Sequence, residues 1–280
     1  MTLGAAEASK LLLETAEAGG TAAVVVVATA SAPNAGRRVG VTKTSDGRTG
    51  RHGGLGSPEL DGPALELIAE ALADPRARDG LLTVEIGGET VELYLEVRLP
   101  VQELVVVGAG HIAQPMAHLG SLLGFHVTVL DDRPDFATRD RFPDAHRLVR
   151  ADFSDPFAEV PLHERSHLLL VTRGHKYDYE CLVRALRADP PPAYIGMIGS
   201  RRRVRATYVQ LLEEGLDREL IDRIYAPVGL DIGAETPEEI AVAVAAELVM
   251  LHRGGTGVSL KDVERVAERF FKAPHGENGT

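Results

Sequence analysis

The sequence of residues 104–134, LVVVGAGHIAQPMAHLGSLLGFHVTVLDDRP, predicts a strand, a glycine turn, a helix and a second strand in succession. Leu104–Val107 is short, apolar and rich in β-branched residues, as central parallel strands are. Gly108, Gly110 and Ala113 then form the pattern G-x-G-x-x-A. In this pattern the first glycine permits a tight turn, the second lets a phosphate approach the backbone, and the alanine lets the helix pack closely on the sheet.

Two acidic residues follow the second predicted strand. Asp131 and Asp132 stand directly after Phe125–Leu130, and Asp131 lies 23 positions after Gly108 (131 − 108). An acid at about this distance binds ribose hydroxyls in dinucleotide-binding folds. His111 begins the helix and faces the turn. This context favours a nucleotide-binding βαβ unit over the alternative, in which the glycines only make a tight turn.

The amino-acid composition excludes several classes of function. The 280 residues carry a net charge of −11, which argues against a nucleic-acid partner and against an anionic membrane surface. The single cysteine, Cys181, excludes an internal disulfide and a cysteine-based metal site, and it fits a reducing compartment. No targeting segment is visible, and the apolar run Ala22–Ala30 is far too short to span a bilayer. We therefore expect a cytoplasmic protein without a metal site of its own.

The chain is predicted to divide at Pro100 into two α/β domains. Residues 1–99 form the smaller one, with a helix in 1–18, strands over 21–30 and 38–44, a helix over about 58–72 and a hairpin over 81–99. Residues 100–254 alternate strands with helices, which predicts a Rossmann-like, doubly wound parallel sheet. Residues 255–280 are a tail with one more predicted helix, from about Ser259 to Phe271.

Two further segments are rich in glycine. In residues 50–57 four glycines fall within seven positions, too many for a loop that only turns; three of them, Gly53, Gly54 and Gly56, are candidate site residues. Residues 196–203, GMIGSRRR, predict a second junction from strand to helix. Gly199, Ser200 and Arg201 are anion-site candidates here, because arginine at a helix N-terminus opposes the helix dipole unless an anion binds between them. The alternative is a solvated basic helix start paired with acids elsewhere.

Three more candidates lie in the second half of the chain. His175 and Asp178 follow a predicted strand, where they would meet as a base and its orienting partner; capping of the next helix is the equal alternative for Asp178. Asp231 precedes a helix over about 236–251, which is nearly all apolar and is expected to be buried. Cys181 falls opposite the apolar positions of its helix, so we expect an exposed, incidental thiol.

Together these motifs resemble the XdhC/CoxI family of accessory factors, which mature xanthine dehydrogenase and related molybdenum hydroxylases. The matching strings span about residues 103–250 in the family's order: VVVGAGHIAQPMAHLGSLLGFHVTVLDDRPDFA, RFPDA, GHKYDYECLVRAL, YIGMIGSRRR and APVGLDIGAETPEEIAVAVAAE. The loop GRHGGLGSPELD also resembles the family's amino-terminal domain. Many members carry a cysteine in that loop and this chain has none, so a loop thiol has no role here.

The resemblance implies a carrier, and not an enzyme, for the molybdenum cofactor in its pterin or dinucleotide form. It implies that the cofactor acquires sulfur with the help of a cysteine desulfurase, that an apo-molybdenum hydroxylase receives it, and that the chain is a homodimer. By matched position the implied site residues are Gly108, Gly110, His111, Asp131, Asp132, Arg133, Ser200, Arg201 and Asp231. The alternative is an NAD(P)-dependent oxidoreductase acting on a small anionic substrate, with His175 as its acid–base group.

Overall fold

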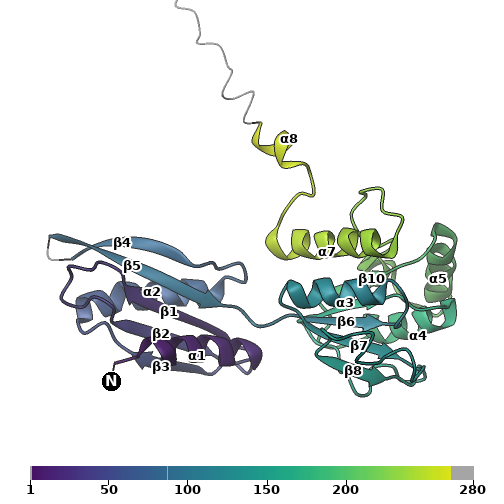
Figure 1. Ribbon diagram of the computed structural model, residues 1–280, viewed down its shortest axis with the longest axis horizontal. Helices are drawn as coiled ribbons and strands as arrows, with labels where there is room; N and C mark the ends of the chain where they lie inside the picture. The colour runs from purple at the N-terminus through teal and green to yellow at the C-terminus, as the bar shows by residue number, and fades with distance from the viewer. Residues whose placement is uncertain (1, 87, 266–280) are drawn as a thin grey trace, which may run out of the picture.

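A computed structural model describes residues 2–86 and 88–265 and places them in two domains joined by a short extended linker (Figure 1). The amino-terminal domain is an antiparallel five-stranded sheet in the order β3-β2-β1-β5-β4. Its helices cover opposite faces: α1 packs on Ala22 and Val24, and α2 on the alternate residues Ala23 and Val25. The elements are α1 (Ala5–Glu17), β1 (Thr21–Val27), β2 (Arg38–Lys43), β3 (Thr49–Gly53), α2 (Pro58–Ala73), β4 (Gly80–Ile86) and β5 (Glu89–Arg98).

The first half of the predicted glycine-rich loop belongs to a β-strand. The residues up to Gly53 form β3, which pairs with β2. Only the residues after Gly53 form a loop, and it leads into α2, where Ser57 accepts a hydrogen bond from the Glu59 N–H. Gly53 has φ +70°, and a Cβ there would lie 2.6 Å from the carbonyl oxygen of Arg38. The glycine therefore permits a close contact between neighbouring strands. Sequence reasoning missed this strand because glycine disfavours extended pairing in isolation.

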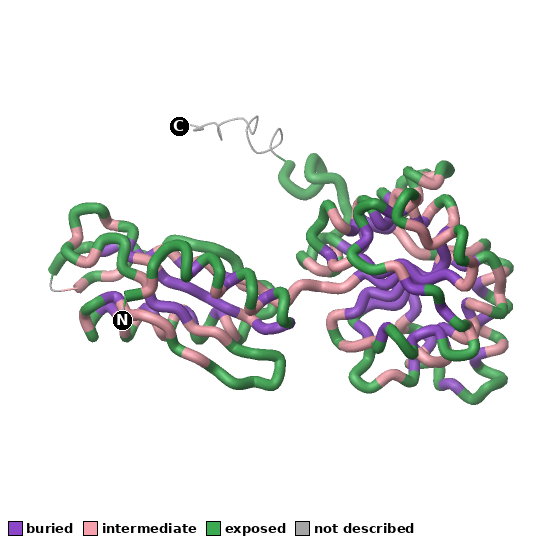
Figure 2. The backbone as a smooth tube through the Cα atoms, turned by 60° about the horizontal axis from the view of Figure 1, so that its bottom comes forward, coloured by how far each residue is buried: buried purple, intermediate pink, exposed green. Residues whose placement is uncertain are grey.

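The carboxyl-terminal domain contains the predicted doubly wound sheet, which is confirmed. Its six strands run parallel in the order β11-β10-β9-β6-β7-β8, the arrangement of a Rossmann fold. The strands are β6 (Glu103–Val107), β7 (His126–Asp131), β8 (Arg147–Arg150), β9 (Ser166–Leu170), β10 (Tyr194–Met197) and β11 (Ile224–Tyr225). Figure 2 shows the buried strands as a continuous layer through this domain.

Helices cover both faces of this sheet. α3 (Ala113–Leu122) and α7 (Pro237–Arg253) share one face, while α4 (His175–Leu186), α5 (Arg201–Glu213) and α6 (Arg218–Ile221) share the other. The central strand β6 alternates between the two layers: Leu104 and Val106 pack with α3 and α7, Val105 and Val107 with α4 and α5. All four side chains are fully buried, which explains the uniformly apolar run in the sequence.

The structure corrects the expectation for Cys181. Its side chain is fully buried, together with Asp178, Leu182 and Ala185 of the same helix. α4 packs both on the sheet and against its neighbour α5, so the buried face is rotated from the stripe that the apolar residues alone suggested. Burial raises the pKa of the Cys181 thiol well above its ordinary value. The thiol is a small core group rather than an exposed one.

The helix predicted at 236–251 and the predicted tail helix differ from expectation in how far they are buried and how far they extend. α7 is not wholly buried: Val242, Val249 and Leu251 are exposed. The tail contains a short exposed helix, α8 (Leu260–Glu264), and the end of the predicted tail helix, 266–271, lies outside the described residues. No helix in the described part of the chain is long and apolar enough to cross a membrane.

Candidate functional site at the carboxyl edge of the parallel sheet

The glycine turn lies at the point where the sheet reverses its winding. β6 and β9 are neighbours, but α3 follows β6 on one face and α4 follows β9 on the other. Such a divergence opens a crevice at the carboxyl edge of the sheet. Gly108 has φ +103°, and a Cβ there would lie 2.6 Å from the carbonyl oxygen of Val171. A Cβ on Gly110 would meet no atom within 4 Å. The first glycine is required by packing, and the second faces open space.

Asp131 holds this turn in place. Its carboxylate, 2% exposed, accepts hydrogen bonds from the Ala109 N–H at 2.7 Å and from the Arg133 N–H at 2.9 Å. The Arg133 guanidinium adds two more, both at 2.8 Å. Burial disfavours the charged form, but the hydrogen bonds from Arg133 and Ala109 outweigh it and lower the pKa of Asp131 to about 2. The buried carboxylate joins the ends of β6 and β7.

Asp132 is the more accessible acid of the pair. Its two carboxylate oxygens accept hydrogen bonds from Arg173 at 2.6 and 2.7 Å. Arg173 also donates to the Tyr177 hydroxyl at 2.6 Å and lies over that ring. Hydrogen bonding to Asp132 raises the pKa of Arg173 above its ordinary value. These contacts tie the end of β7 to the start of α4, and sequence reasoning missed Arg173 and Tyr177 altogether.

A buried ion pair joins the starts of α4 and α5. Asp178, fully buried, is paired with the guanidinium of Arg203 and accepts a hydrogen bond from the Thr172 hydroxyl at 2.6 Å. Arg203 also donates to the carbonyl and hydroxyl oxygens of Thr172, at 3.1 and 2.9 Å. Burial raises the pKa of Asp178, and the Thr172 and Arg203 contacts only partly offset it. Arg203, a residue of the predicted anion site, is therefore an internal structural cation.

The predicted pairing of His175 with Asp178 is wrong. The Nδ1 atom of His175 lies 3.0 Å from the Thr207 hydroxyl, and the carboxylate of Asp178 is occupied by Thr172 and Arg203. Thr207 and Arg203 belong to α5, 32 and 25 positions away from the residues that they contact, and Thr172 follows β9, six positions before Asp178. No base with an orienting acid results from this arrangement.

The other arginines at the start of α5 are exposed. Ser200 caps the helix by accepting a hydrogen bond from the Arg203 N–H at 3.3 Å. The side chains of Arg201 and Arg202 make no ion pair or hydrogen bond with any residue in 2–86 or 88–265. They line an open cavity of about 600 Å³ with Arg205, Ala206 and Val209. Cations are thus available beside the N–H groups of the first turn.

The loop before α7 reaches the same edge. α3 and α7 pack side by side, and residues near their carboxyl ends, Leu123 and Leu248, line one cavity, so both N-termini lie at the carboxyl edge of the sheet (Figure 1). Asp231 is exposed in the loop before α7, which starts with the predicted Thr236–Glu239 capping box. Deeper in this layer, Tyr194 donates a 2.5 Å hydrogen bond to Glu247.

The structure brings some of the predicted site residues together and separates others. The turn at Gly108–Gly110 and the turn at Gly199 follow strands two places apart in the sheet, roughly 10 Å at the usual strand spacing. His111 and Ala113 lie at the start of α3, and Ala113 is buried against the sheet. The glycine-rich loop of the amino-terminal domain, however, lies elsewhere.

That loop lies at the far end of its own domain. Gly53 pairs with Val39, whereas Thr49 pairs with Lys43 and Lys43 with Thr21. Thr21 is at the linker end of the sheet, beside the end of β5, so Gly53, Gly54 and Gly56 lie at the opposite end. Figure 1 shows this end, near the N-terminus, pointing away from the parallel sheet. The two glycine-rich segments therefore form separate surfaces.

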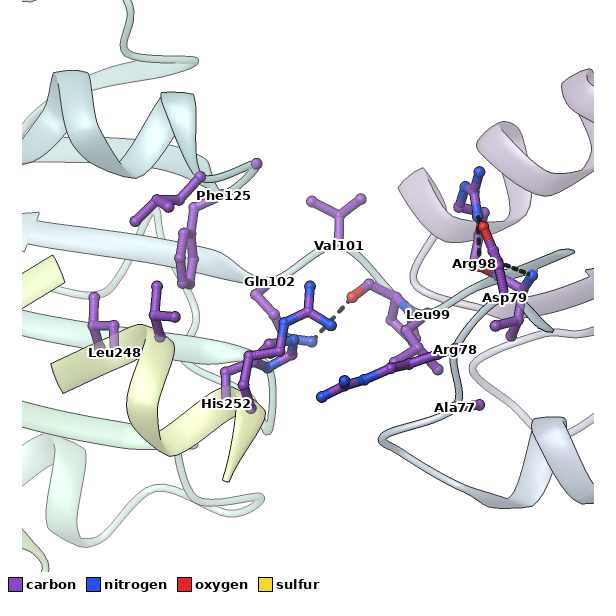
Figure 3. A pocket seen from close by; sticks show the side chains of 16 residues that line it. Ala77, Arg78, Asp79, Arg98, Leu99, Val101, Gln102, Phe125, Leu248 and His252 are labelled. Carbon is purple, nitrogen blue, oxygen red and sulfur yellow. Dashed lines mark hydrogen bonds and ion pairs between the residues drawn. The ribbon is translucent and has the colours of Figure 1, made fainter. Parts of the chain in front are cut away.

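Two larger cavities flank the parallel sheet. One of about 760 Å³ lies at its carboxyl edge, between the ends of β7 and β8 and the start of α4. The other, about 680 Å³, lies between the domains; Figure 3 shows Phe125, Leu248 and His252 on one side and Arg78, Asp79 and Arg98 on the other. The second cavity is at the amino-terminal edge of β6 and so is remote from the glycine turn. Among the described residues no group of histidines, cysteines and acids is arranged to hold a metal ion.

Residues 104–248 match the family described as the XdhC Rossmann domain. The chain belongs to the XdhC family. The matched region contains the whole crevice, from the glycine turn of β6 to α7. The resemblance seen in the sequence motifs is thus confirmed at the level of the family.

Two curated relatives and one solved structure extend the comparison. The Escherichia coli K12 protein YqeB is 32% identical over 216 residues, 73% of this chain and 39% of that protein. A Bacillus subtilis 168 protein, named as a probable subunit of xanthine dehydrogenase, is 33% identical over 168 residues, 59% of this chain and 47% of that protein. The chain spans less than half the length of these relatives. A crystal structure described as a xanthine dehydrogenase from Bacillus halodurans aligns with a TM-score of 0.60 at 23% identity, covering 95% of this chain and 70% of that one, which shows a common fold.

Proposed function

We propose that this chain is an accessory protein that carries the molybdenum cofactor for a molybdenum hydroxylase of the xanthine dehydrogenase type. Membership of the XdhC family supports this proposal, as does the name of the Bacillus subtilis relative, which refers to xanthine dehydrogenase. We propose further that a cysteine desulfurase supplies the cofactor's sulfur, that two copies of the chain associate, and that they work in the cytoplasm. The chain binds, orients and transfers its cargo, and no catalytic residue is assigned.

The carboxyl edge has the chemistry that a pterin phosphate or pyrophosphate requires. A phosphate fits where backbone N–H groups at helix N-termini meet free cations. Gly110 leaves the space beside the first turn of α3 open, and Arg201 and Arg202 extend from the first turn of α5 without a partner among the described residues. The open space at Gly110 is the observation on which this proposal chiefly depends. When bound, the molybdenum centre supplies the redox chemistry of the client enzyme, while this chain shields and positions the phosphate end.

The alternative of an NAD(P)-dependent oxidoreductase has less support in the geometry. Its ribose-binding acid would be Asp131, but that carboxylate is buried and already accepts hydrogen bonds from Ala109 and Arg133. A ribose would have to displace one of them. The acid–base pair of His175 and Asp178 is also not formed, since each residue is bonded to a different partner.

Cofactor retention tests the proposal. The purified protein would be incubated anaerobically with molybdenum cofactor, passed through a desalting column, and analysed for molybdenum and pterin fluorescence. Gly110→Val fills the open space beside the turn, and Gly80→Val is its control, because a Cβ on Gly80 also meets nothing within 4 Å but lies on β4 of the other domain. We expect one cofactor per chain, lost in Gly110→Val and kept in Gly80→Val.

A second pair of variants tests the cations. Arg201→Ala is expected to weaken retention about tenfold, as the loss of one charge-assisted contact does, and Arg218→Ala, an exposed arginine of α6, is its control. Parallel titrations with NADH and NADPH test the alternative. Failure to retain the cofactor, combined with saturable NADH binding and hydride transfer to a small carbonyl compound, would contradict the carrier proposal.

A further inference from the structure

The cavity between the two domains has the size and the lining of a small-molecule site (Figure 3). Its volume is about 680 Å³, and ligand sites often lie at domain interfaces. The α2–β4 loop and the end of β5 form one wall, and the α3–β7 loop and the end of α7 form the other. The buried side chains of Val97, Phe125 and Leu248 contribute to its floor, and Leu123 and Val249 line it while remaining exposed. This lining suits a ligand with an apolar body.

The charges around the cavity leave two arginines without partners, one from each domain. Asp79, the acid on this lining, accepts hydrogen bonds from the Arg98 guanidinium and from a backbone N–H of β5. The side chains of Arg78 and Arg253 are exposed and make no ion pair or hydrogen bond with the described part of the chain. Figure 3 shows Arg78 extending across the cavity toward His252. In a protein with a net charge of −11, two free cations at one cavity favour an anionic ligand.

Few polar contacts fix the orientation of the two domains. No hydrogen bond or ion pair joins the described residues before Pro100 directly to residues 103–264. The contacts run through the linker, where the Val101 N–H donates to the Ala16 carbonyl and the Val101 carbonyl accepts from Arg165, both at 3.1 Å. Like charges on different domains repel each other, and an anion between them replaces this repulsion by attraction. An anionic ligand therefore stabilises the orientation that brings both arginines to the cavity.

We propose that this cavity binds a small organic phosphate with an apolar body, and that the bound ligand holds the two domains in one orientation. Arg78 binds the phosphate from the amino-terminal domain and Arg253 from the carboxyl-terminal domain. A terminal phosphate is doubly charged and has three acceptor oxygens, enough for a guanidinium on each side. Leu123 and Val249 contact the apolar body. The site lies at the opposite edge of the sheet from the glycine turn and does not depend on the carrier function proposed above.

Naphthyl phosphate is a suitable probe, because it joins a planar apolar ring to a dianionic phosphate. The protein has no tryptophan, so the anisotropy of naphthyl fluorescence is measured without tryptophan emission. We expect saturable binding to the full chain, weakened about tenfold in Arg78→Gln and in Arg253→Gln. Naphthoate, with a single charge, is expected to bind about tenfold more weakly than naphthyl phosphate.

Two exposed valines of α7 provide a matched pair of variants. Val249 lines the cavity, whereas Val242 is equally a surface residue of the same helix but does not line it. Val249→Glu adds an acid beside Arg253 and is expected to abolish binding of naphthyl phosphate, and Val242→Glu is expected to leave it unchanged. Equal binding by both variants, or by naphthoate and naphthyl phosphate, overturns the assignment.

The orientation of the domains is measured by double electron–electron resonance. The native Cys181 is buried, so spin labels attach to cysteines introduced by Lys43→Cys and Leu122→Cys, which are exposed positions in different domains. We expect a broad distribution of label distances that narrows with naphthyl phosphate and stays broad when Val249→Glu is added. A distribution that the saturating probe leaves unchanged overturns the effect on orientation.

Gly110→Val separates this site from the carrier function. We expect this variant to bind naphthyl phosphate as tightly as the unmodified protein, because Gly110 lies at the other edge of the sheet. Probe binding that is lost in Gly110→Val and kept in Arg78→Gln would place the probe on the glycine turn, and the cavity assignment would be wrong while the carrier function stood. Failure of cofactor retention together with probe binding that depends on Arg78 would have the opposite meaning.

Discussion

Replacing Asp131 by asparagine tests whether this residue maintains the glycine turn. The carboxylate accepts four hydrogen bonds, from the Ala109 and Arg133 N–H groups and from two nitrogens of the Arg133 guanidinium. Asparagine has one acceptor oxygen and presents an NH₂ group where a second acceptor is needed. The substitution therefore removes the charge that pairs with Arg133 and places two donors against each other, either at Ala109 or at Arg133.

The pKa of Asp131 gives the magnitude. The pKa is about 2 in the folded protein and 3.8 ordinarily, and this difference corresponds to about 2 kcal/mol of stability. Because the folded-state pKa is the lower one, the contribution is fully present above pH 5 and is lost as the pH falls toward 2; about half is lost by pH 3. We expect Asp131→Asn to cost at least about 2 kcal/mol at pH 7 and progressively less below pH 4.

Hydrogen exchange in urea measures this loss within the correct domain. Mass spectrometry of peptides that contain the fully buried strand β6 follows unfolding of the parallel sheet separately from the amino-terminal domain. Asp132→Asn is the matched control: this neighbour is 30% exposed and pairs with Arg173 at the surface, so its loss should cost no more than about 1 kcal/mol. This role is refuted if Asp131→Asn is as stable as Asp132→Asn. It is also refuted if Asp131→Asn loses the same free energy of unfolding at pH 7 as at pH 3.

Three further outcomes follow from the same core. Arg203→Met leaves the buried Asp178 carboxylate unpaired and should lower the free energy of unfolding by about 3–5 kcal/mol in urea titrations, most of it regained in the double variant Asp178→Leu/Arg203→Met. Cys181 should resist dithionitrobenzoate in the native protein and react only on unfolding, which a time course of absorbance at 412 nm measures. Gly108→Ala should lower the melting temperature, whereas Gly110→Ala should leave it nearly unchanged, because only Gly108 has a positive φ and a close neighbour.

The segment predicted best from sequence is the one whose interactions are local. The strand at Leu104–Val107, the turn and the helix that follows lie within a single βαβ unit, and the apolar spacing that defines them does not depend on distant residues. The same is true of the capping box Thr236–Glu239, in which both hydrogen bonds stay within four positions. Short-range geometry of this kind is contained in the order of residues.

The side-chain partners at the site could not be predicted in the same way. Asp178 is bonded to Arg203, 25 positions away, and His175 to Thr207, 32 positions away. Three of these four residues had a plausible local role: Asp178 as a cap or an orienting acid, His175 as a base, and Arg203 as part of an anion site. Only the packing of α4 against α5 decides between those roles. The misplaced thiol of Cys181 has the same origin, since a helix covered on two sides buries a wider face than its apolar stripe indicates.

The two glycine-rich segments show that glycines can be present for different reasons. Gly53 and Gly56 have positive φ angles, which disfavour other residues, and a Cβ on Gly53 would also lie 2.6 Å from the carbonyl oxygen of Arg38. Gly110 has neither constraint. A glycine that packing does not require, in a loop where helix N-termini and open space meet, is better explained by a ligand than by the fold. By this criterion we infer that the carboxyl edge of the parallel sheet is the surface that binds a ligand.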